Sequence, residues 1–66
     1  MTIIINGEEN IFEDKSTLED ILIKLDLSTK VMAAAVNMEI VKQDNWKTHK
    51  LCDGDKLELL DFVGGG

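Results

Sequence analysis

The chain has 66 residues, which is enough for one small domain with a single hydrophobic core. Thirteen acidic residues against seven lysines give a net charge of −6, and because arginine is absent the composition argues against binding to nucleic acid. A hydrophobic fraction of 44% argues against a disordered chain, and apolar runs of only a few residues argue against a membrane span, so we expect a soluble cytoplasmic protein.

A domain below about 70–80 residues often needs a disulfide or a structural metal for its stability. Cys52 is the only cysteine and His49 the only histidine, so neither an intrachain disulfide nor a zinc site can form. We expect regular packing to hold the domain together, with no metal. Cys52 is then predicted to be a small buried hydrophobe, and His49 to be exposed in a polar loop.

The N-terminus is predicted to form a β-hairpin. The β-branched run of residues 2–5 is followed at once by Asn6-Gly7, the dipeptide best suited to the two positive φ angles of a type I′ turn. The returning strand should cover residues 8–13, with either Ile11 or Phe12 facing inward.

An amphipathic helix should follow. Ser16 can cap the first amides of this helix while Glu19 reaches back to the cap, which is the pattern of a capping box. Apolar residues then recur at the spacing of one helical stripe, and they are Leu18, Ile21, Leu22 and Leu25. The stripe must cover a sheet, because a lone helix of this length is marginal in water.

The middle of the chain favours two short strands. Residues 31–36 are rich enough in alanine for a helix, but Asn37 after them and Ile40-Val41 beyond it indicate strands joined by a turn. Trp46 lies in the polar stretch of residues 45–50, which we interpret as a loop or a single helical turn. The indole should close one end of the core.

The last strand is predicted to span residues 56–62, after a turn at Asp53-Gly54-Asp55. Residues 3–5 and 57–60 are the most apolar strand candidates, so they should lie side by side at the centre of the sheet. The expected fold is α+β: a mixed sheet of four to five strands with one main helix across one face, as in a ubiquitin-like β-grasp domain. We assign this domain to residues 1–63 and a flexible glycine tail to 64–66.

Several short motifs, weak alone, become specific through their order and spacing. They are Asn6-Gly7-Glu8, Thr17-Leu18, Ala35-Val36-Asn37, Trp46, Leu51 with Gly54-Asp55, Leu57-Glu58-Leu59 and the final Gly64-Gly65-Gly66. Through them the whole chain resembles the ThiS family of sulfur carrier proteins in thiamin synthesis. One departure is Val41-Lys42-Gln43, where that family usually has Val-Pro-Arg.

This resemblance implies a chemical role for the carboxylate of Gly66. A ThiF-like adenylyltransferase would activate it with ATP and magnesium, a sulfur donor system would convert it to a thiocarboxylate, and a ThiG-like thiazole synthase would take the sulfur. The chain itself would bind no cofactor. It would be a monomeric protein cosubstrate and not an enzyme.

Two related roles remain open. The small subunit of molybdopterin synthase shares the fold and tail but is usually longer and has a proline before its glycines, whereas Phe62-Val63 stands here and favours the thiazole pathway. A ubiquitin-like protein modifier would use the same activated glycine to join a target lysine. A plain binding module with an inert tail is a third possibility.

The end of the chain is the candidate partner-binding site. Three terminal glycines alone are typical of a frayed end, but here a predicted strand runs straight into them. Glycine has no Cβ, so such a tail can thread a narrow channel. The expected partner-binding residues are Glu58, Asp61, Phe62, Val63, Gly64 and Gly65. Because two of these are acidic, partner enzymes should offer basic patches to them.

Overall fold

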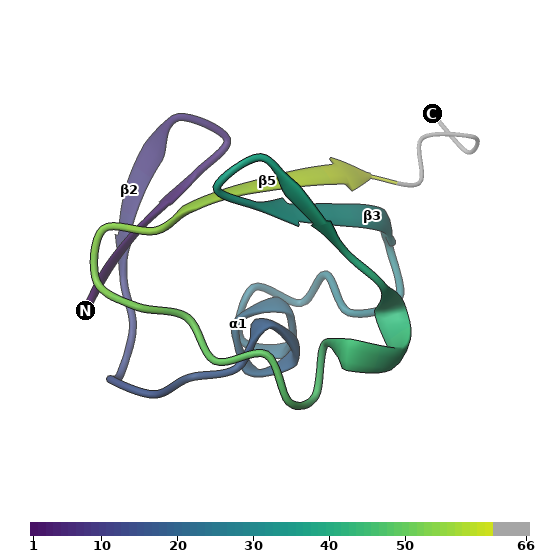
Figure 1. Cartoon of the computed structure of the whole chain (residues 1–66), viewed down its shortest axis with the longest axis horizontal. Helices are drawn as coiled ribbons and strands as arrows, with labels where there is room; N and C mark the ends of the chain where they lie inside the picture. Colours follow the sequence, from purple (N-terminus) through teal and green to yellow (C-terminus); the bar gives the residue numbers. More distant parts are fainter. Residues whose placement is uncertain (62–66) are drawn as a thin grey trace.

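The computed structural model describes residues 1–61, except for the side chain of Asp61. The described elements are β1 (Thr2–Ile5), β2 (Glu8–Ile11), α1 (Leu18–Lys24), β3 (Val31–Val36), β4 (Glu39–Val41), a 3-10 turn η1 (Gln43–Asn45) and β5 (Lys56–Asp61). The five strands form one mixed sheet, and α1 lies across one face of it (Figure 1). This is the predicted α+β arrangement. The predicted end of the last strand at Phe62 lies outside the described residues.

The strands from the two ends of the chain meet at the centre of the sheet, in the order β2-β1-β5-β3-β4. β5 pairs with β1 in parallel, placing Leu57 beside Ile5. On its other side β5 pairs with β3 in antiparallel fashion, with Leu57 opposite Val36. The prediction that the two most apolar strands lie side by side is confirmed.

Both hairpins turn through two residues with positive φ. Asn6 and Gly7 have φ values of 48° and 88°, as the type I′ prediction requires. Asn37 and Met38 have φ values of 50° and 72° and join β3 to β4 in the same way. The strand interpretation of residues 31–36 is therefore confirmed over the helical one.

Phe12, and not Ile11, is the inward-facing residue after β2. Phe12 is 7% exposed and belongs to the core, whereas Ile11 is 76% exposed. Ile11 pairs with Thr2 in the β1–β2 ladder. Because side chains alternate along a strand, the two neighbours point to opposite faces of the sheet.

The helix cap lies one residue later than predicted. Thr17 is the N-cap: its Oγ1 accepts from the Asp20 amide at 3.1 Å, and Asp20 Oδ2 accepts from the Thr17 amide at 3.0 Å. Hydrogen bonding of the Asp20 carboxylate to the Thr17 amide, and secondly to the Thr17 side chain, lowers the pKa of Asp20. Ser16 instead donates its hydroxyl to the Glu13 carbonyl at 2.8 Å, so the predicted Ser16–Glu19 box is wrong. Both pairs have the same spacing, which is why the sequence did not separate them.

Trp46 is a core residue, as predicted, and it ties the segment after β4 to the helix. Its side chain is 3% exposed, and its Nε1–H donates to the Val41 carbonyl at 2.9 Å. The Trp46 carbonyl accepts from the Glu19 amide at 3.0 Å, and the His49 carbonyl accepts from the Leu18 amide at 2.9 Å. Two free amides of the first helical turn are thereby satisfied by this segment.

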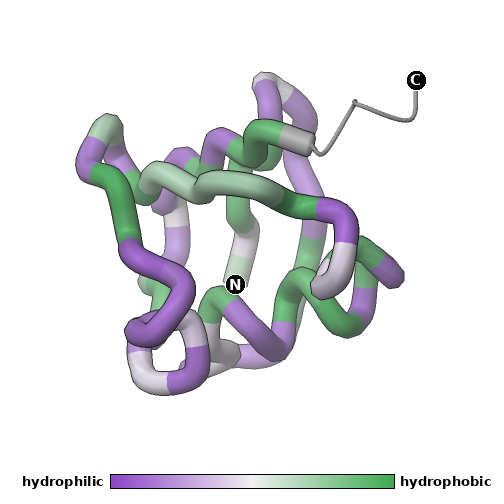
Figure 2. Tube along the Cα trace, turned by 90° about the vertical axis from the view of Figure 1, so that its right-hand side faces the viewer, coloured by the Kyte–Doolittle hydropathy of each residue, from purple (hydrophilic) through white to green (hydrophobic). Residues whose placement is uncertain are grey.

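The core lies between α1 and the sheet. Its buried apolar residues are Ile3, Ile5, Phe12, Leu18, Ile21, Leu22, Val31, Ala34, Val36, Val41, Trp46, Leu51, Leu57 and Leu59. Leu25, the last member of the predicted helical stripe, is only partly buried. Figure 2 shows hydrophilic residues gathered in the loops that connect these apolar segments. No helix in residues 1–61 is long and apolar enough to cross a bilayer.

Two predictions of burial are corrected. Cys52 is exposed and not a buried hydrophobe. Its neighbour Leu51 enters the core, while the Cys52 amide donates to Asp55 Oδ2 at 2.8 Å and so belongs to the turn before β5. His49, predicted to be exposed, is half-buried.

The position of β5 predicts effects of very different size on stability for two leucines of the same strand. Leu57→Ala removes a side chain with 0% exposure and should lower the free energy of unfolding by about 2–5 kcal/mol. Leu60→Ala, the matched control, removes one that is 60% exposed and should change it by about 0.5 kcal/mol or less. Urea unfolding followed by Trp46 fluorescence measures both. Equal losses would mean that β5 does not face the core as described.

Candidate functional site

The structure describes the strand that leads to the predicted site, but not residues 62–66 of the site itself. Of the predicted site residues, Glu58 is described in full and Asp61 by its backbone, as the last residue of β5. Phe62, Val63, Gly64, Gly65 and Gly66 lie outside the described residues. The geometry of the site is therefore the geometry of β5 and of the sheet surface around it.

β5 has one buried face and one open face. Leu57 and Leu59 are buried against the helix side of the sheet, whereas Glu58 and Leu60 are exposed on the opposite side. This alternation follows from the period of two along a strand. The strand that leads toward residues 62–66 is thus anchored by one face and leaves the other available to a partner.

A mostly apolar surface surrounds the open face of β5. Leu60 is opposite Ala33 on β3, and Glu58 is opposite Ala35, which in turn is opposite Ile40 on β4. Directly opposite residues share a face of the sheet, so these five side chains lie together. We call Ala33, Ala35, Ile40, Glu58 and Leu60 the outer-face patch.

The patch is hollowed because of residue size. Ala33 and Ala35 of β3 lie between the larger side chains of Ile40 and Leu60, and the resulting hollow is also lined by Asn6 and Leu59. Ile40 and Leu60 are both more than half exposed in the described structure. Exposed large apolar side chains gathered on one face are typical of protein-binding surfaces.

Glu58 is the acidic residue of this patch. Lys56 lies two residues earlier on the same face of β5, beside Ile4 of β1. The open face of β5 therefore presents a carboxylate with a lysine before it and apolar side chains beside and after it. A cationic side chain of a partner would form an ion pair with this carboxylate, while the neighbouring apolar side chains exclude water.

Sequence reasoning found Glu58 but missed the apolar members of the patch. From the sequence alone Ile40 belongs to a short strand, and the alanines bear only on the choice between strand and helix. Their common surface depends on the register that pairs Ala35 with both Glu58 and Ile40. The available signal was the run of three alanines at residues 33–35, because two of them must share the face opposite the third in a strand.

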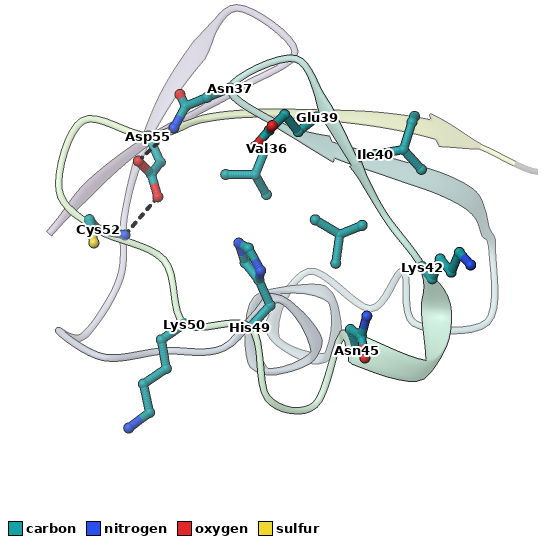
Figure 3. A pocket seen from close by; sticks show the side chains of 11 residues that line it. Val36, Asn37, Glu39, Ile40, Lys42, Asn45, His49, Lys50, Cys52 and Asp55 are labelled. Atoms are coloured by element: carbon teal, nitrogen blue, oxygen red, sulfur yellow. Dashed lines mark hydrogen bonds between the residues drawn. The ribbon is translucent and has the colours of Figure 1, made fainter.

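A second hollow lies between the β3–β4 hairpin and the segment that precedes β5 (Figure 3). In it Asp55 accepts from Asn37 Nδ2 at 3.0 Å and from the Cys52 amide at 2.8 Å. The first bond joins the turn before β5 to the β3–β4 hairpin, and the second lies within that turn. Figure 3 shows His49 pointing into the hollow and Lys50 pointing away from it. Within residues 1–61 no three His, Cys, Asp or Glu side chains are grouped so as to hold a metal ion.

The departure from the family's usual Val-Pro-Arg lies at the edge of this second hollow. Val41 ends β4 and is buried, Lys42 is the N-cap of η1, and Gln43 begins η1. The side chains of Lys42 and Gln43 are exposed. The altered positions are thus on the surface, directly after the strand that carries Ile40.

A comparison with models of protein families shows to which family the chain belongs. The model described as the ThiS family matches residues 2–66. The chain belongs to the ThiS family. The sulfur carrier protein ThiS of Bacillus subtilis is 35% identical over 54 residues, which cover 82% of each chain. The family predicted from the sequence is confirmed.

Relatives of another kind are much longer. The thiazole synthase of Paramagnetospirillum magneticum is 39% identical over 66 residues, which are all of this chain but 20% of that relative. This ThiS-family chain therefore spans one fifth of the length of that protein. The thiazole synthase of Magnetococcus marinus shows the same coverage at 32% identity.

The solved structures support the fold. The crystal structure of the thiamine biosynthesis protein ThiS from Geobacter metallireducens superimposes with a TM-score of 0.82 over the whole of both chains, at 24% identity. The solution structure of a thiamine biosynthesis protein from the same organism gives 0.79. The predicted ubiquitin-like β-grasp fold is confirmed.

Proposed function

We propose that this protein is a sulfur carrier of thiamin thiazole synthesis, in which the carboxylate of Gly66 carries the sulfur. The observation that carries the proposal is the match to the ThiS family across residues 2–66. The Bacillus subtilis relative, which is covered over most of its length, is named a sulfur carrier protein. On this proposal the chain is a cosubstrate that is consumed and regenerated, and not a catalyst.

The chemistry of a carboxylate dictates the order of steps. A carboxylate is a poor electrophile, so an oxygen of Gly66 first attacks the α-phosphorus of ATP and displaces pyrophosphate. Hydrosulfide from the donor then adds to the carbonyl carbon of the acyl-adenylate and expels AMP, which leaves a thiocarboxylate and releases one proton. We assign ATP, magnesium and the first step to a ThiF-like adenylyltransferase, and the sulfur to a separate donor.

The outer-face patch is the proposed docking surface for that adenylyltransferase. Five residues follow Asp61, and a fully extended chain spans at most about 3.3–3.6 Å per residue, which limits the reach to about 17 Å. An active site that holds Gly66 must therefore lie close to the end of β5. The patch includes Leu60, the residue before Asp61, and Glu58 within it favours a basic partner.

The acceptor of the sulfur is proposed to be a thiazole synthase. Two relatives that bear this name contain a segment similar to the whole of this chain, within a polypeptide about five times as long. A carrier-like segment joined to such an enzyme supports a working partnership between the two. We propose that this chain delivers its sulfur to a ThiG-like synthase.

Extension of the chain by one residue after Gly66 tests the site of activation. With a ThiF-like adenylyltransferase and magnesium ATP, the unextended chain should release pyrophosphate and gain the mass of an adenylate. The extended chain should do neither, because its Gly66 carbonyl is held in a peptide bond. Trp46 fluorescence checks that the extended chain is folded. Equal adenylation of both chains would exclude the Gly66 carboxylate.

Two aspartate substitutions test the docking surface. Leu60→Asp puts a charge within the outer-face patch and should raise the KM of the adenylyltransferase for this chain by about tenfold or more, as expected for a residue that contributes strongly to an interface. Ile23→Asp, the matched control, changes a similarly exposed residue on α1, which covers the opposite face of the sheet, and should leave KM unchanged. Equal effects of the two substitutions would remove the patch from the interface.

A further inference from the structure

Asn6 makes contacts that its place in a turn does not require. It is the first central residue of the β1–β2 turn, and its φ of 48° suits that position. Its side chain, however, reaches across to β5. Asn6 Oδ1 accepts from the Leu59 amide at 2.9 Å, and Nδ2 lies 3.5 Å from the Leu59 carbonyl oxygen. The Asn6 amide also donates to the Leu57 carbonyl at 3.0 Å.

These contacts take the place of a backbone pairing that β1 does not make with β5. The parallel ladder between β1 and β5 ends where Ile5 lies beside Leu57, because β1 then turns away into β2. Two residues further along β5, Leu59 has no β1 residue beside it. The amide side chain of Asn6 offers one acceptor and one donor, as a peptide group does, and so extends the ladder toward Asp61.

We propose that Asn6 is a positioning residue that holds the end of β5 in place for docking of the activating partner. The bonds at Leu59 lie between Glu58 and Leu60, the two β5 members of the outer-face patch, and two residues before Asp61. Holding this segment in advance reduces the ordering that a partner must impose when it binds. This inference rests on the proposed sulfur-carrier function and adds a residue outside the tail to it.

Asn37 provides a control within the same molecule. It occupies the corresponding position of the other type I′ turn, with a φ of 50°. It also clasps β5: Oδ1 accepts from the Lys56 amide at 3.0 Å, and Nδ2 donates to Asp55 Oδ1 at 3.0 Å. These bonds are at the start of β5, five residues before Asp61 and not two. The two asparagines thus differ chiefly in which end of the strand they hold.

The test compares Asn6→Gly with Asn37→Gly. Glycine accepts positive φ, so each substitution keeps its turn and removes only the side-chain bonds. In Asn6→Gly, amide hydrogen exchange at Leu59 should be about tenfold faster, and the KM of the adenylyltransferase for the chain should rise about fivefold with kcat unchanged. Asn37→Gly should leave KM and the Leu59 exchange rate unchanged.

Asn6→Asp separates the two bonds. The aspartate keeps an acceptor for the shorter bond from the Leu59 amide and loses the donor of the longer one. It should therefore restore most of the protection at Leu59 and bring KM back toward the wild-type value. Because this variant introduces no glycine, it also separates the loss of the side-chain bonds from a loosening of the turn.

Three results would overturn the inference: unchanged Leu59 exchange in Asn6→Gly, an equal rise in KM for both glycine variants, or no recovery in Asn6→Asp. Failure of the proposed function would look different. In that case the wild-type chain would not be adenylated at all, although Asn6 still protected Leu59 from exchange, and the docking role of Asn6 would fall with the function.

Discussion

The pairing of β5 between β1 and β3 is the constraint on which the structure depends. It joins the first and last strands of the chain, brings Leu57 and Leu59 into the core, and aligns the open face of β5 with the alanines of β3. One strand therefore stabilises the domain with one face and displays Glu58 and Leu60 with the other. A change of register by one residue would exchange these faces and destroy both properties.

The proposed function divides the work between a stable domain and its partners. The described residues form a compact sheet and helix without a disulfide among them, and the side chains of its turns and cap satisfy backbone groups at the strand and helix ends. The chemistry is assigned to a single carboxylate beyond β5. A domain of this kind needs only to be recognised and to deliver that group, while nucleotide, magnesium and sulfur come from other proteins.

Features set by local chemistry could be predicted from the sequence, and features set by register could not. Asn6-Gly7 determined the first turn, and the apolar run of residues 57–60 indicated a central strand. The cap was placed at Ser16 and not Thr17, because both residues have an acidic partner three positions later. The prediction that Cys52 is buried is wrong, because Asp55 holds the Cys52 amide in a turn. Ile40 in the patch and the reach of Asn6 to Leu59 follow only from the assembled sheet.

The most direct test is the intact mass of this protein isolated from cells that make thiamin. The account predicts a population in which one oxygen of the terminal glycine is replaced by sulfur, and which reverts to the unmodified mass on hydrolysis. Chains found only unmodified when thiazole synthesis is active, or found joined through Gly66 to lysines of other proteins, would contradict sulfur carriage.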